Sequence, residues 1–169
     1  EFWFGIPLCM RDKNEAVRWG IYPIELWVSS KVDTKIRITS ADGNMNQNYA
    51  LKAKEMRIIS ISDDLENEES EVITQKGIFI KAEDPITVGV FTAYKWSGEA
   101  YRVTPVEWLG KEYYTLNLFQ DYLMMASGYK EYKPAQFLII ATEDNTIVKI
   151  TPKVDTQGGI KAGTTKQIK

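Results

Sequence analysis

The chain has 169 residues, of which 44% are hydrophobic and 26% charged, a balance typical of folded globular domains. Its 21 basic and 23 acidic residues leave a net charge of −2. This balance argues against a nucleic-acid partner and against a polybasic membrane-binding surface. No apolar run in the sequence approaches the roughly 18 residues that a membrane-spanning helix needs.

Apolar and polar residues alternate along most of the chain, as expected of half-buried β-strands. The alternation is clear in residues 35–39, where Ile36 and Ile38 share one face. In chain order, we predict strands over residues 22–28, 35–39, 56–62, 77–81, 86–94, 101–104, 113–118, 137–142 and 146–151. Turn-forming pairs such as Asp42-Gly43 and Asp84-Pro85 separate these runs. The pattern predicts an all-β fold, an antiparallel two-sheet β-sandwich of jelly-roll or Ig-like type.

A hairpin is predicted where Glu143, Asp144 and Asn145 separate the two β-rich runs 137–142 and 146–151. Asp and Asn tolerate left-handed backbone angles, which a tight turn requires. One short helix is compatible with the pattern, at residues 14–19 or 117–127. The favoured interpretation of both segments is loop.

We treat residues 1–169 as a single domain. The chain opens at Glu1 with the apolar run Phe2–Phe4, and residues 164–169 begin a strand-like alternation at the other end. We therefore expect a piece of a longer extracellular protein. A single cysteine, Cys9, allows no internal disulfide, and we expect it to be a small buried residue rather than a reactive thiol.

Two acidic segments are candidate cation sites. Asp63, Asp64 and Glu66 open an oxygen-rich stretch that continues to Glu71, and calcium prefers several oxygen ligands. The spacing is not that of an EF-hand, so a solvated loop is the favoured alternative. Glu143, Asp144 and Asn145 could also hold a cation, but a turn that caps its own backbone accounts for them. No cofactor is predicted, with calcium as the one alternative.

An aromatic group at Tyr94, Trp96 and Tyr101 is the candidate ligand-binding site. Flat aromatic faces suit the C–H groups of sugar rings, whereas packing in the core or at a sheet edge is the competing explanation. No catalytic residue is predicted, because a chain without histidine cannot build a Ser-His-Asp or Cys-His arrangement. A pair of carboxylates for glycoside hydrolysis is the one enzymatic alternative.

Several blocks, in order, resemble the N-terminal domain family of IgG-Fc-binding proteins. They are EFWFGIP at residues 1–7, GIFIKAEDPITV at 77–88, EAY at 99–101, PVEWLGKEYY at 105–114, FLIIATEDNTIV at 137–148 and ITP at 150–152. The resemblance implies an extracellular all-β domain of a secreted or cell-surface protein, as in many bacterial members. It does not imply that this chain binds antibody.

The sequence therefore predicts a non-catalytic extracellular binding or structural module. We expect it to act in adhesion or assembly of a cell-surface protein, including self-assembly into a fibre or layer. Its partner would be a protein, either another surface protein or a second copy in a homo-oligomer, because open sheet edges can pair with other chains. The alternative is a carbohydrate-binding module that uses exposed tryptophan and tyrosine.

Overall fold

The computed structural model describes residues 1–8, 24–93, 98–116 and 135–169. Its elements are β1 (Phe2–Phe4), β2 (Ile6–Pro7), β3 (Ile24–Ser30), β4 (Thr34–Ser40), β5 (Asn46–Leu51), β6 (Met56–Ile61), the 3-10 helix η1 (Asp63–Leu65), β7 (Glu66–Asn67), β8 (Ile78–Ala82), β9 (Ile86–Ala93), β10 (Gly98–Arg102), the 3-10 helix η2 (Val106–Trp108), β11 (Val148–Ile150) and β12 (Lys166–Ile168). Nearly all regular structure in this part of the chain is therefore strand, which confirms the predicted all-β class.

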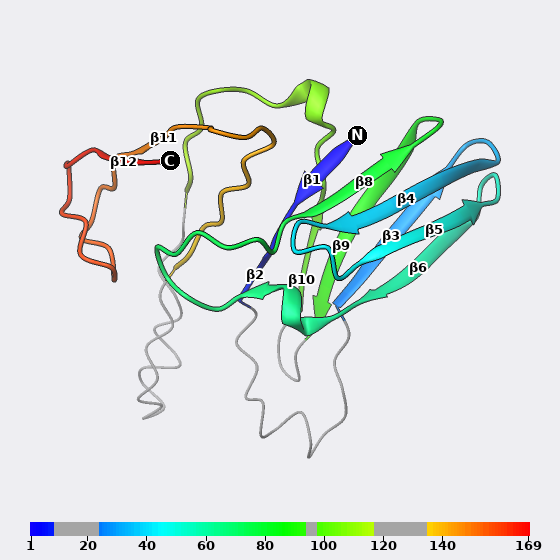
Figure 1. The fold of residues 1–169 in the computed structure, drawn as a ribbon, viewed down its shortest axis with the longest axis horizontal. Coiled ribbons are helices and arrows are strands. Elements are labelled where there is room, and N and C mark those ends of the chain that lie inside the picture. Colours follow the sequence, from blue (N-terminus) through cyan, green and yellow to red (C-terminus); the bar gives the residue numbers. More distant parts are fainter. Residues whose placement is uncertain (9–23, 94–97, 117–134) are drawn as a thin grey trace, which may run out of the picture.

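Two four-stranded sheets form the layers of a sandwich (Figure 1). One sheet has the strand order β1-β8-β4-β5, and the other has the order β10-β9-β3-β6. All pairs within these two sheets are antiparallel. Two smaller pairs accompany them, the antiparallel β11-β12 and the parallel β2-β7.

The core lies between the two sheets and follows directly from the period-two pattern. Every second residue of β3 is buried, and β4 repeats the same alternation. The largest fully buried side chains are Ile6, Ile24, Leu26, Val28, Ile36, Ile38, Ile78, Ile80, Val88 and Val90. Burial of one such side chain stabilises a fold by roughly 1.5–3 kcal/mol. These inward faces account for the layered architecture.

Most strands predicted in the first two-thirds of the chain are confirmed. The runs 35–39, 56–62 and 77–81 correspond to β4, β6 and β8, and the described parts of 22–28 and 86–94 belong to β3 and β9. The run 101–104 begins earlier than predicted, as β10. Strand β5 was not predicted, because its sequence NQNYAL is rich in amides that disfavour strands. It forms against β4, which supplies a hydrogen-bonding edge.

Three predictions in the last third are wrong. Residues 113–116, the described part of the run 113–118, form no strand, and neither do residues 137–142. The turn at Asp144 and Asn145 exists, and Asn145 has a φ of 59°. The predicted hairpin does not, because β11 pairs with β12 and not with residues 137–142. The two candidate helices, 14–19 and 117–127, lie outside the described residues.

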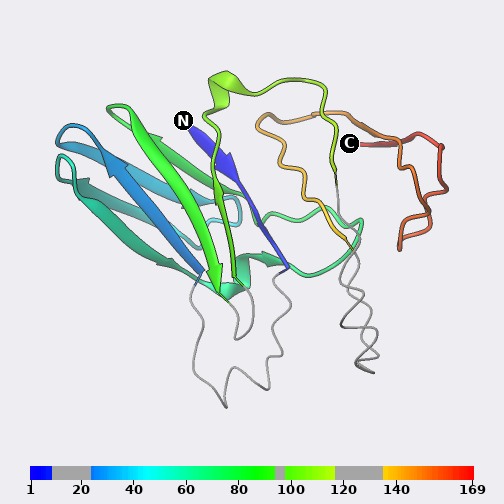
Figure 2. The same ribbon diagram turned by 180° about the vertical axis from the view of Figure 1, so that it is seen from behind.

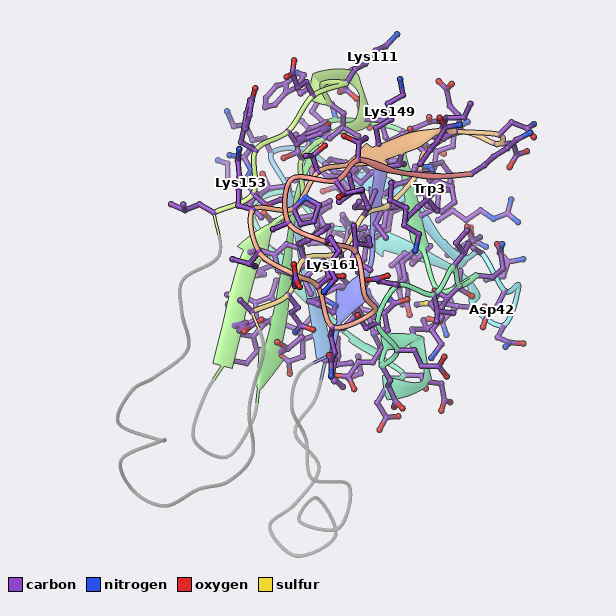
Figure 3. All side chains as sticks on the ribbon, turned by 90° about the vertical axis from the view of Figure 1, so that its left-hand side faces the viewer. Trp3, Asp42, Lys111, Lys149, Lys153 and Lys161 are labelled. Atoms are coloured by element: carbon purple, nitrogen blue, oxygen red, sulfur yellow. The ribbon has the colours of Figure 1, made fainter. Side chains whose placement is uncertain are left out.

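The C-terminal segment 135–169 lies beside the sandwich, on the side of β1 (Figure 2). It meets the sandwich at Gly5, where an added Cβ would lie 2.5 Å from Ile140 Cδ1 and 2.7 Å from Leu138 Cδ2. A side chain at this position would therefore require Ile140 and Leu138 to shift. Seen from that side, the segment lies in front of the sheets and carries Lys149, Lys153 and Lys161 (Figure 3).

A second attachment of this segment uses Glu71. The carboxylate of Glu71 accepts hydrogen bonds from the Thr156 hydroxyl and from Lys166 Nζ, the latter at 3.3 Å. These bonds, with Thr156 foremost, lower the pKa of Glu71 below its ordinary value. The acidic loop is therefore an anchor for the basic C-terminal segment, a role that the sequence did not suggest.

Candidate binding face

The outward side of β3 begins the candidate site. Because Ile24, Leu26 and Val28 point into the core, the residues between them point outward. Trp27 is one of them and is 38% exposed. Its indole N–H donates to Glu25 Oε2 at 2.8 Å, so the polar atom of the ring is satisfied within the chain. The apolar face of the ring is left for contacts.

Strand register places other apolar groups around Trp27. Ile58 of β6 lies opposite Trp27 on one side, and Gly89 of β9 lies opposite it on the other. Ile58 is 51% exposed, and Met56 on the same side of β6 is 56% exposed. Phe91 stacks on Trp27 with ring centroids 5.4 Å apart and an interplanar angle of 27°. We call this set of five residues the apolar face.

A shallow groove of about 300 Å³ runs over Gly89. Its walls include Trp27, Phe91, Ala100 and Arg102. Glycine leaves this space open, since an added Cβ would meet only ordinary contacts, the nearest being the Tyr101 carbonyl oxygen at 3.8 Å. The missing side chain at Gly89 therefore leaves the groove open, with Trp27, Phe91 and Arg102 among the residues that line it.

The outward side of the other sheet is polar around β4. Lys35 and Arg37 project from β4, and Lys81 lies opposite Arg37 on β8. Arg37 Nε donates to Asn46 Oδ1 of β5 at 3.0 Å. The apolar pair of this outer side, Trp3 and Phe79, is at the β1 end, with centroids 4.9 Å apart. We call Lys35, Arg37, Asn46, Asn48 and Lys81 the polar face.

The aromatic group predicted from the sequence is only partly described. Tyr94 and Trp96 lie outside the described residues. Tyr101 lies opposite Val90, on the inward side of β10, and its hydroxyl donates to the Gly5 carbonyl oxygen at 2.7 Å. Burial, with a smaller contribution from Glu99, raises the pKa of the Tyr101 phenol. Tyr101 therefore joins the two sheets and does not stand on the apolar face.

The first residues of the predicted acidic loop lie in regular secondary structure. Asp63 and Asp64 form the first turn of η1, and the Ser62 hydroxyl caps it by accepting from the Asp64 N–H at 3.3 Å. Glu66 is only 3% exposed and belongs to β7. Among the described residues, no three carboxylate, cysteine or histidine side chains gather as a group that could hold a metal ion.

The predicted turn residues have structural contacts. The Asp84 N–H donates to Thr34 Oγ1 at 3.1 Å, and the Pro85 carbonyl accepts from Ser30 Oγ at 3.2 Å. Beside Asp144 and Asn145, the Glu143 carbonyl accepts from Thr146 Oγ1 at 2.6 Å. Both groups lie where the sequence analysis predicts turns.

Sequence reasoning missed the apolar face, although a signal for it was present. An alternating strand whose inward positions are already apolar leaves any further aromatic residue outside, and Trp27 is in this position. No sequence pattern indicated that Ile58, Gly89 and Phe91 would lie around Trp27. Their proximity depends on the pairing of β3 with β6 and β9, which are distant in the chain.

Fold and surface together define an all-β sandwich module with an exposed apolar face. Residues 99–169 match the model of a family described as IgGFc binding protein. This match confirms the family resemblance over the blocks that begin at Glu99, Pro105, Phe137 and Ile150. No curated protein and no solved structure matches the chain. Within the described ranges, no helix is long and apolar enough to cross a membrane.

Proposed function

We propose that this chain is a non-catalytic binding module of a secreted or cell-surface protein, and that it binds a protein partner through the apolar face. The observation that carries the proposal is the exposure of Trp27, Met56 and Ile58 side by side on one sheet. Contiguous exposed apolar surface is costly in water and marks interaction sites in soluble proteins. Aromatic residues and methionine are also enriched in the centres of protein interfaces.

The shape of the surface favours a protein over a small molecule. The groove over Gly89 is shallow and open, whereas small-molecule sites are concave and enclose most of their ligand. A flat sheet surface with a central tryptophan suits a broad partner surface, in which a few aromatic residues contribute most of the binding energy. The description of the matching family names IgG Fc, and our proposal for this chain is the more general one of a protein partner.

The biological role proposed for this contact is adhesion or assembly at a cell surface. The family match supports an extracellular site of action. The lack of histidine supports a role in binding, because general acid–base and nucleophilic catalysis most often use that residue.

Site-specific photo-cross-linking in the full-length protein, on cells that produce it, tests the proposal. A photo-reactive phenylalanine analogue replaces Ile58 on the apolar face, and the matched control replaces Asn48 on the polar face, which is also exposed. We expect protein adducts from position 58 that are lost when Trp27 is changed to serine. Equal labelling from both positions, or none from position 58, would contradict the proposal.

A carbohydrate ligand is the second candidate function, and the groove over Gly89 is the observation that favours it. The stacked Trp27 and Phe91 rings offer flat apolar surface, and Arg102 offers hydrogen-bond donors for hydroxyl groups. Glycan-array binding that disappears in both Trp27→Ala and Gly89→Leu would support this function. Wild-type protein that binds no glycan would eliminate it.

A further inference from the structure

Arg102 stands at one end of a row of outward residues that crosses the β10-β9-β3-β6 sheet. It lies opposite Gly89 of β9, Gly89 lies opposite Trp27 of β3, and Trp27 lies opposite Ile58 of β6. Residues directly opposite one another in neighbouring strands share one side of a sheet. The guanidinium of Arg102 therefore belongs to the same outer side as the apolar face, at the edge strand β10 and beside the groove over Gly89.

The charge of Arg102 is not used within the described part of the chain. The residue is exposed, and in the described ranges its guanidinium makes no ion pair, hydrogen bond or cation–π contact. The other two arginines in these ranges are held by their own chain. Arg37 donates to Asn46, and Arg57 lies over the Tyr49 ring and donates to the Ala50 carbonyl. Arg102 is therefore the guanidinium that is free to bind a partner.

One carboxylate shares this outer side of the four strands, and it already has a contact. Glu25 accepts the Trp27 indole N–H at 2.8 Å, and it lies on β3, two strands away from β10. The two remaining charged residues of these strands alternate to the inner side, since Glu99 lies opposite the buried Thr92 and Arg57 lies opposite Val28. The groove therefore has an unpaired cation on one wall, and this charge complements an anionic group.

We propose that the protein partner of the apolar face presents a carboxylate next to an apolar side chain. The apolar side chain lies over Gly89, between the Trp27 and Phe91 rings on one side and Arg102 on the other. The carboxylate accepts paired hydrogen bonds from Arg102, because the planar fork of a guanidinium matches the two oxygens of a carboxylate. Arginine at the border of an apolar contact is also typical of protein interfaces.

This inference rests on the proposed function and deepens it, since it names the chemistry of the partner segment. An acidic sugar also carries a carboxylate, but the exposed apolar surface continues past the groove to Ile58 and Met56, which do not line it. A protein segment covers the groove and this extension together. We therefore assign the carboxylate to an aspartate, a glutamate or a chain terminus of a protein.

Selection of random peptides from a display library by the purified full chain tests the inference. Wild-type protein should select peptides with Asp or Glu beside Leu, Ile or Val. Arg102→Glu should weaken binding of these peptides at least roughly tenfold, because a charge-assisted hydrogen bond is lost and a repulsion replaces it. Exchange of the acidic residue of the peptide for lysine should restore binding to Arg102→Glu. Arg37→Glu on the polar face is the matched control and should bind as wild type.

Two further variants separate the two halves of the contact. Gly89→Val fills the groove and should weaken binding, while the preference for acidic over neutral peptides remains. Arg102→Gln keeps the length of the side chain without its charge, and should remove that preference while the circular dichroism spectrum stays unchanged. Both results are needed, because the first reports the apolar side chain and the second the carboxylate.

The outcomes distinguish this inference from the proposed function. Peptides that depend on Trp27 but show no acidic preference, or that still bind Arg102→Glu, overturn the inference and leave the proposed function in place. Binding of acidic glycans that is lost in Arg102→Glu, with no peptide selected, overturns it in favour of a sugar ligand. If no peptide depends on Trp27 and position 58 gives no protein adducts on cells, both proposals fail.

Discussion

The two outer faces of the sandwich differ although their strands follow the same alternation. On the β10-β9-β3-β6 sheet the outward positions carry Trp27, Ile58 and Phe91, and on the other sheet they carry Lys35, Arg37 and Lys81. At the β1 end of the polar sheet, Trp3 lines the same hollow as Leu138 and Ile140 of the C-terminal segment. The C-terminal segment thus borders Trp3, whereas in the described structure no segment covers Trp27.

The largest expected effect is a loss of stability from a substitution on the inward side of β3. Leu26→Ala removes a side chain with no exposed surface next to Trp27 in the chain, and should destabilise the fold by about 2–5 kcal/mol through the cavity that it leaves. Chemical denaturation measures this loss. A destabilisation below about 1 kcal/mol would contradict the assignment of Leu26 to a tightly packed core.

The second effect compares the two faces directly. Trp27→Ser should weaken partner binding by about 2 kcal/mol, roughly 30-fold, because a central tryptophan is typical of interface hot spots. Its cost to stability should be only about 0.5–1.5 kcal/mol, from the lost stacking on Phe91. The matched control Arg37→Ser, on the polar face, should leave binding unchanged. Equal losses in both variants would remove the distinction between the faces.

The third prediction concerns Gly5, where the C-terminal segment contacts the sandwich. Gly5→Ala introduces a methyl group where Ile140 and Leu138 already pack, and should cost about 1 kcal/mol as these side chains move away. Hydrogen exchange of residues 135–142 should become faster, while exchange of β3 and β6 stays the same. Unchanged exchange in the segment would show that the contact at Gly5 does not hold it in place.

The smallest effect is a pH dependence of the C-terminal attachment. The pKa of Glu71 is lowered in the folded protein, so its stabilising bonds are complete above the ordinary pKa of a glutamate and are lost as the pH falls through the lowered value. NMR shifts of Thr156 and Lys166 should therefore change only in acid. Glu71→Gln should abolish this titration, and Glu69→Gln, an exposed acidic neighbour, should not.

Much of the fold could be predicted because strand alternation is a local property. Ile36 and Ile38 had to share a face in any strand, so the inward side of β4 was evident from the sequence. Residues 137–142 show where this reasoning fails. Their apolar, β-branched sequence is typical of a strand, yet a strand also needs a neighbouring strand, and in the described structure β11 pairs with β12. Local preference alone does not supply a partner.

The candidate site was less predictable than the fold. The acidic residues Asp63, Asp64 and Glu66 were a candidate cation site because their charges are close in sequence. In the structure, Glu66 is buried in a strand, and Asp63 and Asp64 lie in a capped turn. Tyr101 was a candidate ligand-binding residue because it is aromatic. In the structure, its hydroxyl donates to the carbonyl oxygen of Gly5, directly after β1. A residue type suggests chemistry only when its surroundings are known, and those surroundings come from other parts of the chain.

By itself, the sequence determined the all-β class, the inward side of most strands and the positions of several turns, because each depends on neighbours within a few residues. Only the tertiary structure decided that Trp27, Ile58, Gly89 and Phe91 lie together, that Arg102 lies opposite Gly89, and that Glu71 anchors the C-terminal segment. These features arise from pairing between strands far apart in the chain. Period-two alternation specifies which side of a strand faces inward, but it does not specify which strand lies next to it.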